Sequence, residues 1–357
     1  MAITSMISVV VPLYNHEKFI REAIDSVLLQ PVDNLEIIVV DDGSTDGSVD
    51  VVRSMGDSRI KLYQQKNTGA HAAINRGIQL ARGSFVSILN SDDVYCDNRL
   101  KKCLDYLENT PEVDGLFTKV EAIDSHGEHL YFFPSKLPDI KGEFRSHPDQ
   151  LTALDFLGSN PTITTSNLFC RREVFEEIGF FRNYRYCHDL DWLLRLVTRR
   201  HGRLLHSSLL KYRFHHTNTI KENSEKVFFE IGLILAGFFI EQNSLGSIFG
   251  KLDVSDTLME LNKSLRFRSV DKMMALLLAT VREPSMWEEM RMSLLTDHAH
   301  PFREQCLREI KRLAGDDIVN HNLQQENKQL REEVAALQQE NKLYRASILR
   351  RIGRILT

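Results

Sequence analysis

Apolar and amphipathic segments alternate along the first part of the chain. Three mainly apolar runs lie at 7–11, 35–40 and 85–89, and a further strand-like segment lies at 60–63. Three segments with apolar residues at helical spacing separate them, at 17–30, 48–55 and 68–81. Continuous runs are typical of parallel strands buried on both faces, and the helices between them supply the crossovers. The pattern predicts an α/β fold with a Rossmann-like, mostly parallel open sheet.

Strand-like and helix-like segments continue in a less regular order. Strand candidates lie at 116–123, 130–133, 167–171 and 204–215, and helix candidates lie at 172–178 and 189–197. The polar stretch 134–150 is predicted to be a loop, and the pattern from about 227 to 314 is helical throughout. We therefore expect an α/β domain at 1–222, a helical region at 223–318 and a C-terminal segment at 319–357.

The C-terminal segment has a heptad pattern. Its apolar positions recur every seven residues, at Leu323, Leu330, Leu337 and Tyr344. This spacing predicts a coiled coil at 319–357, and hence a homo-oligomer. The alternative is a single solvated helix, because the repeat is close to the shortest that forms a coiled coil.

The end of this segment is basic and amphipathic. No acidic residue follows Glu340, and Lys or Arg residues alternate with apolar ones from there on. Such a helix binds an anionic membrane surface, although a helix end that packs on its own protein has the same pattern. No signal peptide and no stretch long enough to span a bilayer are apparent. We expect a cytoplasmic protein, with this helix as a peripheral attachment to the inner face of the cell membrane.

Composition narrows the functional classes. Apolar residues make up 42% of the chain and charged residues 26%, which is enough for a packed core. The formal net charge of −4 argues against a nucleic-acid partner held by a basic surface. The five cysteines include no C-x-x-C pair, so free thiols are expected rather than a disulfide framework or a zinc site.

Polar clusters follow three of the predicted strands. The chain reads PLYN at 12–15, DDGSTD at 41–46 and NSDD at 90–93. The carboxyl ends of strands in an open α/β sheet lie at one edge, where ligands bind, and carboxylates gathered there suit a hard divalent cation. Each cluster alone is equally well explained by a turn or a helix cap, but three in order indicate a site.

Two common phosphate-binding motifs are missing from the sequence. No G-x-G-x-x-G follows the first strand, which disfavours a dinucleotide oxidoreductase, and no G-x-x-x-x-G-K-[ST] occurs, which disfavours a P-loop nucleotidase. A phosphate-bearing substrate would therefore be neutralised by a metal ion rather than by a glycine-rich cradle.

Five motifs together resemble the family 2 inverting glycosyltransferases of the A-type fold. They are VVVPLYN, VVDDGSTD, NTGAHAAINRGI, LNSDD and HDLDWLLRL, in the family's order over about residues 7–216. The resemblance implies transfer of a sugar from a nucleotide-sugar, with UDP as the expected nucleotide, to a hydroxyl of a glycan or lipid-linked glycan. It also implies Mg²⁺ or Mn²⁺ as cofactor and a place in surface polysaccharide biosynthesis, such as O-antigen or capsule.

The resemblance also implies roles for individual residues. The family's nucleobase contact maps onto Asp41, and its D-x-D element, which binds the metal and the diphosphate, maps onto Asp92 with Asp93 beside it. Similar enzymes have a metal- or diphosphate-binding histidine at the position of His215, so Asp92, Asp93 and His215 are the expected metal ligands. The expected nucleotide-sugar contacts are Pro12, Tyr14, Asn15, Asp41, Asp42, Gly69, Asn75, Asn90, Ser91 and Asp92.

The family's catalytic base maps onto Asp189. A carboxylate here would take the proton of the acceptor hydroxyl as it attacks the anomeric carbon, and in-line displacement would invert the configuration. Each residue also has a purely structural alternative: a helix N-cap for Asp189, a core or surface position for His215, and the core rather than the acceptor region for Trp192.

Three residues depart from the family pattern. Asn90 stands where the first Asp of D-x-D is common, His188 replaces a Glu before the base, and Ile74 replaces a common Arg. These departures favour the alternative hypothesis, a catalytically degenerate glycosyltransferase fold that acts as a scaffold in a polysaccharide assembly complex. They leave the acidic residues of the expected site unchanged, so sugar transfer remains the main expectation.

Overall fold

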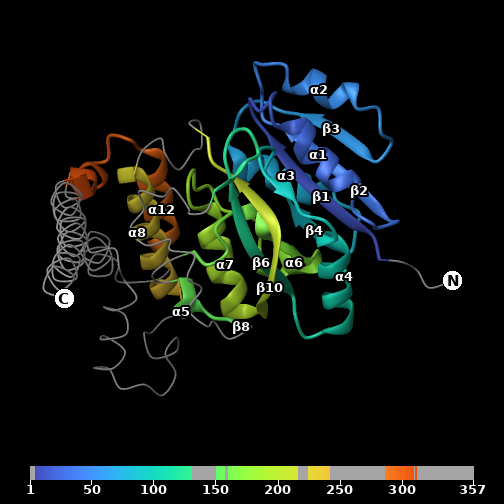
Figure 1. The fold of residues 1–357 in the computed structure, drawn as a ribbon. Coiled ribbons are helices and arrows are strands. Elements are labelled where there is room, and N and C mark those ends of the chain that lie inside the picture. The colour runs from blue at the N-terminus through green and yellow to red at the C-terminus, as the bar shows by residue number, and fades with distance from the viewer. Residues whose placement is uncertain are drawn as a thin grey trace, which may run out of the picture.

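The computed structural model describes residues 5–130, 150–156, 160–215, 224–241, 286–308 and 310–311. One mixed sheet runs through this part of the chain, with helices on both of its faces (Figure 1). The strands are β1 (Ile7–Leu13), β2 (Leu35–Asp41), β3 (Ile60–Gln64), β4 (Phe85–Ile88), β5 (Val94–Tyr95), β6 (Gly115–Ile123), β7 (His129–Leu130), β8 (Gln150–Leu151), β9 (Phe169–Arg171) and β10 (Gly202–Arg213). The helices are α1 (Ile20–Leu28), α2 (Ser48–Ser54), α3 (Ala70–Leu80), α4 (Arg99–Asn109), α5 (Ala153–Phe156), α6 (Glu173–Ile178), α7 (His188–Arg199), α8 (Ser224–Glu241) and α12 (Trp287–Thr296).

The strand order is β3-β2-β1-β4-β9-β6-β10-β5, with β7 beside β6 and β8 beside β10. Strands β3, β2, β1 and β4 are parallel to one another, β9 runs antiparallel to β4 and β6, and β6 and β10 are again parallel. The predicted mostly parallel open sheet is therefore confirmed. Since β2 and β4 flank β1 on opposite sides, the chain reverses direction across the sheet there, and a crevice is expected beyond the ends of β1 and β4.

Two hydrophobic cores lie on opposite faces of the sheet. Val10 and Ile38 face the core formed with α3, α6, α7, α8 and α12, whereas Val9 and Ile37 face the core formed with α1, α2 and α4. This alternation is the two-residue period of a strand, and burial on both faces explains why the strands are continuous apolar runs. Helix α8, outside the expected α/β domain, shares the first core with α7.

Helix α4 and the short strand β5 are absent from the elements expected from the sequence. The buried residues Leu100, Leu104 and Leu107 follow helical spacing, but the charged and polar residues around them dilute the apolar signal. The segment begins at Asn98, whose φ of 63° lies in the left-handed region that asparagine tolerates.

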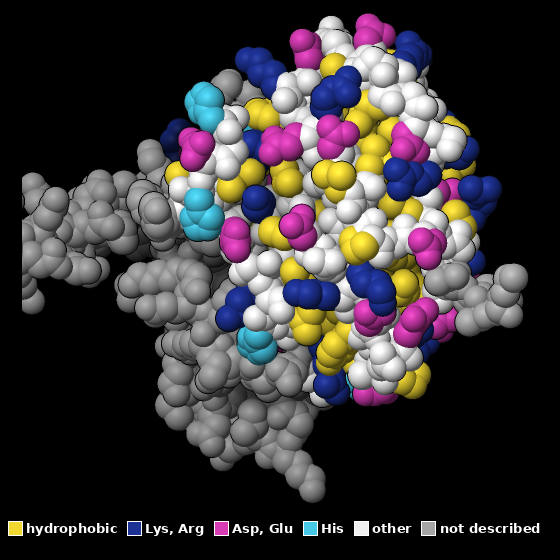
Figure 2. All heavy atoms as spheres, turned by 45° about the vertical axis from the view of Figure 1, so that its right-hand side comes forward, with side chains coloured by type: hydrophobic (Ala, Val, Ile, Leu, Met, Phe, Trp, Pro, Cys, Tyr) yellow, Lys and Arg dark blue, Asp and Glu magenta, His cyan; other side chains and the backbone are white. Residues whose placement is uncertain are grey.

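Several expectations concern residues that the structure does not describe. The predicted strand at 130–133 begins as β7, but 131–149 lie outside the described residues, as do the coiled coil and the basic helix of 319–357. In the region expected to be helical, the described parts are mostly helical, with a turn at 297–300. No helix among the described residues is long and apolar enough to cross a membrane. One face of the described surface carries Lys, Arg, Asp and Glu interspersed (Figure 2).

Candidate functional site

The three polar clusters lie at the carboxyl ends of β1, β2 and β4, at the crevice that the topology predicts. Leu13 and Asp41 are register partners, so β1 and β2 end at the same level. Pro12 is buried within β1, whereas Tyr14 follows it with 47% of its surface exposed. The expected contacts in these three clusters thus lie at one edge of the sheet, and Tyr14 is exposed there.

Asn15 ties the first two clusters together. Its backbone N–H donates to Ser44 Oγ at 2.9 Å, and its Oδ1 accepts from the backbone N–H of Thr45 at 2.8 Å. The φ of Asn15 is 52°, a left-handed conformation that asparagine adopts more readily than most residues. The side chain of Asn15 therefore shapes the loops around the crevice.

Asp42 also holds a loop. Its carboxylate accepts from the backbone N–H groups of Thr68 and Gly69, at 3.0 and 2.8 Å, and thereby fixes the start of α3. Gly69 has a φ of 97°, which a residue with a Cβ adopts only with strain. Asp41, at the end of β2, accepts from the backbone N–H of Ser44 at 3.1 Å.

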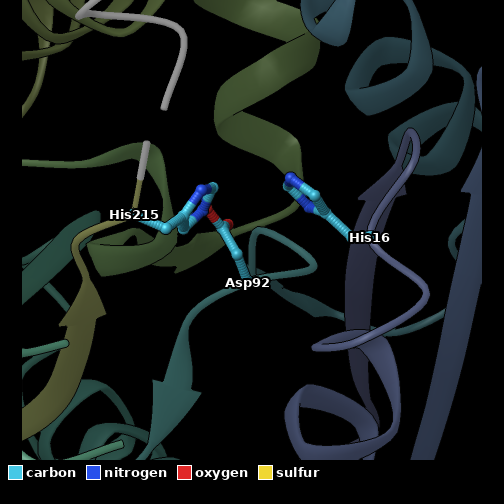
Figure 3. Close-up of side chains that lie close together, drawn as sticks. All are labelled: His16, Asp92 and His215. Carbon is cyan, nitrogen blue, oxygen red and sulfur yellow. The ribbon is translucent and has the colours of Figure 1, made fainter. Parts of the chain in front are cut away.

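Two of the expected ligands and one further histidine form a compact cluster. His16 follows β1, Asp92 lies in the turn after β4, and His215 follows β10, and the three side chains point toward one another (Figure 3). Their ligand atoms all lie within 4.8 Å of one another. His215 Nε2 is 2.8 Å from Asp92 Oδ2, and His16 Nδ1 is 2.7 Å from Ser91 Oγ.

The cluster has the chemistry of a divalent metal site. Burial lowers the pKa of His16 below its ordinary value, so its imidazole is neutral and can ligate a cation at neutral pH. The pKa of Asp92 is lowered despite burial, because His215 and His16 favour its charged form. Two imidazole nitrogens and one carboxylate are a common ligand set for transition-metal ions.

Asp93 does not join this cluster, contrary to expectation. Ser166 Oγ donates to Asp93 Oδ2 at 2.5 Å, and the backbone N–H of Arg213 donates to Asp93 Oδ1 at 3.0 Å. Burial, followed by the neighbouring charge of Asp92, raises the pKa of Asp93 to about 8. Its carboxyl group therefore links the turn after β4 to β10, and His16 takes its place in the candidate ligand set.

Asp189 begins the first turn of α7. Its Oδ1 accepts from its neighbour Leu190 N–H at 2.8 Å, and its Oδ2 accepts from Asn160 Nδ2 at 2.9 Å. Burial raises the pKa of Asp189 to about 6, although both hydrogen bonds favour the charged form. This value suits a general base that works near neutral pH.

Asp189 and the metal-binding candidates converge on the same part of the molecule. Burial raises the pKa of the Tyr212 hydroxyl far above its ordinary value, and the nearby charges of Asp93, Asp92 and Asp189 raise it further. All three carboxylates therefore lie near Tyr212 at the end of β10, and the candidate ligand His215 follows that strand. Asp41, in contrast, lies at the end of β2, two strands away from β4.

The three departures from the family pattern occupy packed positions. Ile74 is fully buried in the core, and Asn90 Nδ2 donates to Thr164 Oγ1 at 3.0 Å. Burial lowers the pKa of His188 to about 4, so it is neutral beside Asp189. None of the three takes up the position of a ligand in the cluster of His16, Asp92 and His215.

Two further residues that the sequence singled out, Asn75 and Trp192, stabilise the fold. Asn75 exchanges hydrogen bonds with the backbone of Phe181, at 2.8 and 3.0 Å, and so ties α3 to the loop after α6. Trp192 is fully buried, stacks on Phe181 and donates from Nε1 to the Gly179 carbonyl at 2.9 Å. Its place is the core, which was one of the two alternatives for this residue.

Sequence reasoning missed His16 and Asn160. His16 follows the PLYN cluster directly, and a histidine directly after a polar cluster at a strand end was a usable signal. Asn160 lies in an irregular segment 28 residues before the start of α7, with no periodic pattern around it. Only folding reveals that Asn160 contacts Asp189.

Comparisons with known proteins find glycosyltransferases among the relatives of this chain. The sequence model described as Glycosyl transferase family 2 matches residues 8–179. An uncharacterized glycosyltransferase of Rickettsia typhi is 31% identical over 216 residues, which are 60% of this chain but only 65% of that relative. The putative glycosyltransferase EpsH of Bacillus subtilis is 30% identical over 273 residues, which cover 70% of this chain and 74% of EpsH.

Solved structures share the fold. S. aureus TarS 1–349 in complex with UDP-GlcNAc has a TM-score of 0.52 and 20% identity, and the match covers 87% of this chain and 92% of that one. The mannosyltransferase PcManGT from Pyrobaculum calidifontis, in complex with GDP-Man and Mn²⁺, has a TM-score of 0.52 and 17% identity, with coverage of 89% and 88%. At these identities the likeness concerns the architecture of the chain.

Proposed function

This chain belongs to glycosyltransferase family 2, and on that premise we propose that it is an active, inverting, metal-dependent enzyme. It transfers a sugar from a nucleotide-sugar to a hydroxyl of a glycan or lipid-linked glycan acceptor. The observation that carries the proposal is the convergence of the cluster of His16, Asp92 and His215 with Asp189 around the end of β10. The structural neighbours that hold UDP-GlcNAc and GDP-Man with Mn²⁺ support the donor class.

The ligand set favours Mn²⁺ over Mg²⁺. Mg²⁺ prefers oxygen ligands and water, whereas imidazole nitrogens bind later transition-metal ions better. His16, Asp92 and His215 would hold the ion, which when bound supplies positive charge to the diphosphate leaving group. The loop that Asn15 and Asp42 shape would position the nucleotide beside Asp41 and Tyr14.

Asp189 is the base in this proposal. Its carboxylate accepts the proton of the acceptor hydroxyl while the hydroxyl oxygen forms a bond to the anomeric carbon. The bond between that carbon and the diphosphate oxygen breaks on the opposite face, so the configuration inverts. Asn160 holds the carboxylate in place, and the pKa of about 6 leaves it mostly charged at pH 7.

Two measurements test the proposal against the scaffold alternative. Isothermal titration of UDP in the presence and absence of Mn²⁺ should show metal-dependent binding, and Asp189→Asn should bind UDP normally but lose turnover by about 10²–10⁴-fold. Retained turnover in Asp189→Asn would remove it from the role of base. No metal-dependent binding, and no turnover with a panel of nucleotide-sugars, would favour the scaffold.

The acceptor and the cellular place of the reaction belong to the same proposal. We place the enzyme in surface polysaccharide biosynthesis at the inner face of the cell membrane, supported by the basic heptad-bearing segment 319–357 of the sequence. A chain truncated after Glu340 should no longer sediment with anionic vesicles while keeping activity on soluble acceptors. Unchanged sedimentation of the truncated chain would refute the attachment.

A further inference from the structure

A buried carboxylate on α8 contacts the segment that leads into the base helix. Glu230 is only 6% exposed, on a helix whose neighbouring residues are almost all apolar. Its Oε1 accepts from the backbone N–H of Arg185 at 2.9 Å, and its Oε2 accepts from those of Tyr186 and Cys187 at 2.8 and 3.0 Å. The two oxygens thus bind three successive N–H groups.

These three N–H groups lie directly before the start of α7. Cys187 is the N-cap of α7, and Asp189 is the second residue of the helix. N–H groups at a helix start have no partner within the helix, and a negative charge there also interacts favourably with the helix dipole. Glu230 therefore fixes both the path of the chain into α7 and the position of its first turn.

A second link joins α8 to α7. Arg182 bridges Glu241, at the end of α8, and Asp191 of α7, with distances of 2.9 and 3.1 Å. Asp191 also pairs with Arg195 one turn further along α7, at 2.8 Å. Helix α8 thus holds the first two turns of α7 at two points, although it lies beyond residues 8–179, which match the family model.

A buried carboxylate costs free energy unless it is well hydrogen-bonded, and an apolar residue at position 230 would leave the N–H groups of residues 185–187 without this acceptor. The free-energy cost of burying this carboxylate is explained if it has a function that an apolar side chain cannot perform. Orienting the base within a fraction of an ångström is such a function, because a displacement of about 1 Å in a reacting group lowers rates by up to about 100-fold.

We propose that Glu230 is a positioning residue for the glycosyl transfer reaction: through the N–H groups of residues 185–187 it fixes Asp189 toward the acceptor hydroxyl. The inference rests on the proposed function, since it assumes that Asp189 is the base. It makes α8 a part of the catalytic unit rather than of a separate helical appendage.

Glu230→Gln tests this with little change of shape. The amide retains one acceptor oxygen, but its NH₂ group faces a backbone N–H, so at least one of the three hydrogen bonds is lost. We expect kcat to fall about 10- to 100-fold, while the Kd for UDP with Mn²⁺ stays within about twofold of wild type. Glu225→Gln, the same change on the first turn of α8, is the matched control and should leave kcat unchanged.

A double-mutant cycle separates positioning from general stability. If Glu230 acts through Asp189, Glu230→Gln should cause no further loss in the Asp189→Asn background, because residues that act as a unit are not additive. Losses that multiply would overturn the inference, as would a Glu230→Gln enzyme with wild-type kcat, or one that loses donor binding together with turnover.

The outcomes for the two proposals are distinguishable. An active Asp189→Asn enzyme removes the base and the inference with it, whereas an inactive Asp189→Asn beside a fully active Glu230→Gln refutes only the role of Glu230. If Glu230→Gln does not fold, Glu230→Asp keeps the charge but withdraws it by one methylene group. It is then measured in the same way, with the same outcomes for and against.

Discussion

Replacing Asn160 by alanine should shift the pH dependence of the reaction toward higher pH. Asn160 Nδ2 donates to Asp189 Oδ2 at 2.9 Å, and this hydrogen bond favours the charged carboxylate. The orientation of the amide follows from its other contacts, since Asn160 Oδ1 accepts from the backbone N–H and the hydroxyl of Thr162 at 3.1 and 2.8 Å. The amide NH₂ group therefore faces the base.

The size of the shift follows from the hydrogen bond that is lost. A hydrogen bond to a charged group contributes about 1.5–3 kcal/mol, and one pKa unit corresponds to about 1.4 kcal/mol. Water that enters the vacated space will replace part of the interaction, so the lower end is expected, an increase of about one unit. The pKa of Asp189 would then rise from about 6 to about 7.

The direction of the effect on activity follows from the role of the base. Only the deprotonated carboxylate accepts a proton, so a higher pKa removes base at a given pH. At pH 6 the deprotonated fraction would fall from about one half to about one tenth, whereas above pH 8.5 protonation would cause almost no loss.

Initial rates of sugar transfer, measured from pH 5 to 9 at saturating donor and acceptor, give the profile of kcat for both enzymes. In Asn160→Ala, the apparent pKa of the acidic limb of the kcat profile should rise by about one unit. Asn109→Ala, at the exposed end of α4, is the matched control and should leave the profile unchanged. A limb that stays in place, or moves to lower pH, would refute the assignment of Asn160 as the partner of a charged base.

Further predictions concern the metal and the packing of the sheet. Asp92→Asn and His16→Ala should each weaken Mn²⁺ binding at least about tenfold in a calorimetric titration, whereas Asp93→Asn should bind Mn²⁺ almost as wild type; a large loss in Asp93→Asn would restore it as a ligand. Gly77→Ala places a Cβ against the side chain of Val10, and such overpacking should lower the free energy of unfolding by about 1–3 kcal/mol in urea denaturation. An unchanged midpoint would show that α3 moves away from β1 without cost.

The sequence alone determined the architecture and the approximate place of the site. Continuous apolar runs reveal strands buried on both faces, and polar clusters after those runs must gather at one edge of a parallel sheet. The NSDD cluster that contains Asp92 was found in this way, whereas the roles of Asp189 and His215 came from the resemblance of their motifs to family 2 glycosyltransferases.

The tertiary structure decided which of these side chains face the crevice. Asp92 and Asp93 are neighbours with identical chemistry, but the turn after β4 directs Asp92 toward His215 and Asp93 toward Ser166. Periodicity records only whether a residue is apolar, so it does not distinguish the two. The direction of a side chain in an irregular turn depends on the backbone dihedrals there and on what packs against it.

The sequence likewise did not predict which residues from distant segments contact one another. Asn160 is 29 residues from Asp189, and Glu230 is 43 residues from Cys187, with no shared period or motif that joins them. Their contacts exist because α8 packs on α7 in one core and the irregular segment before β9 folds back over the first turn of α7. The sequence thus determined the fold and the edge of the sheet at which the candidate site lies, since both follow from local periodicity. Only the packed structure decided which groups contact the proposed base and which histidine joins the candidate metal cluster, because those depend on contacts between distant segments.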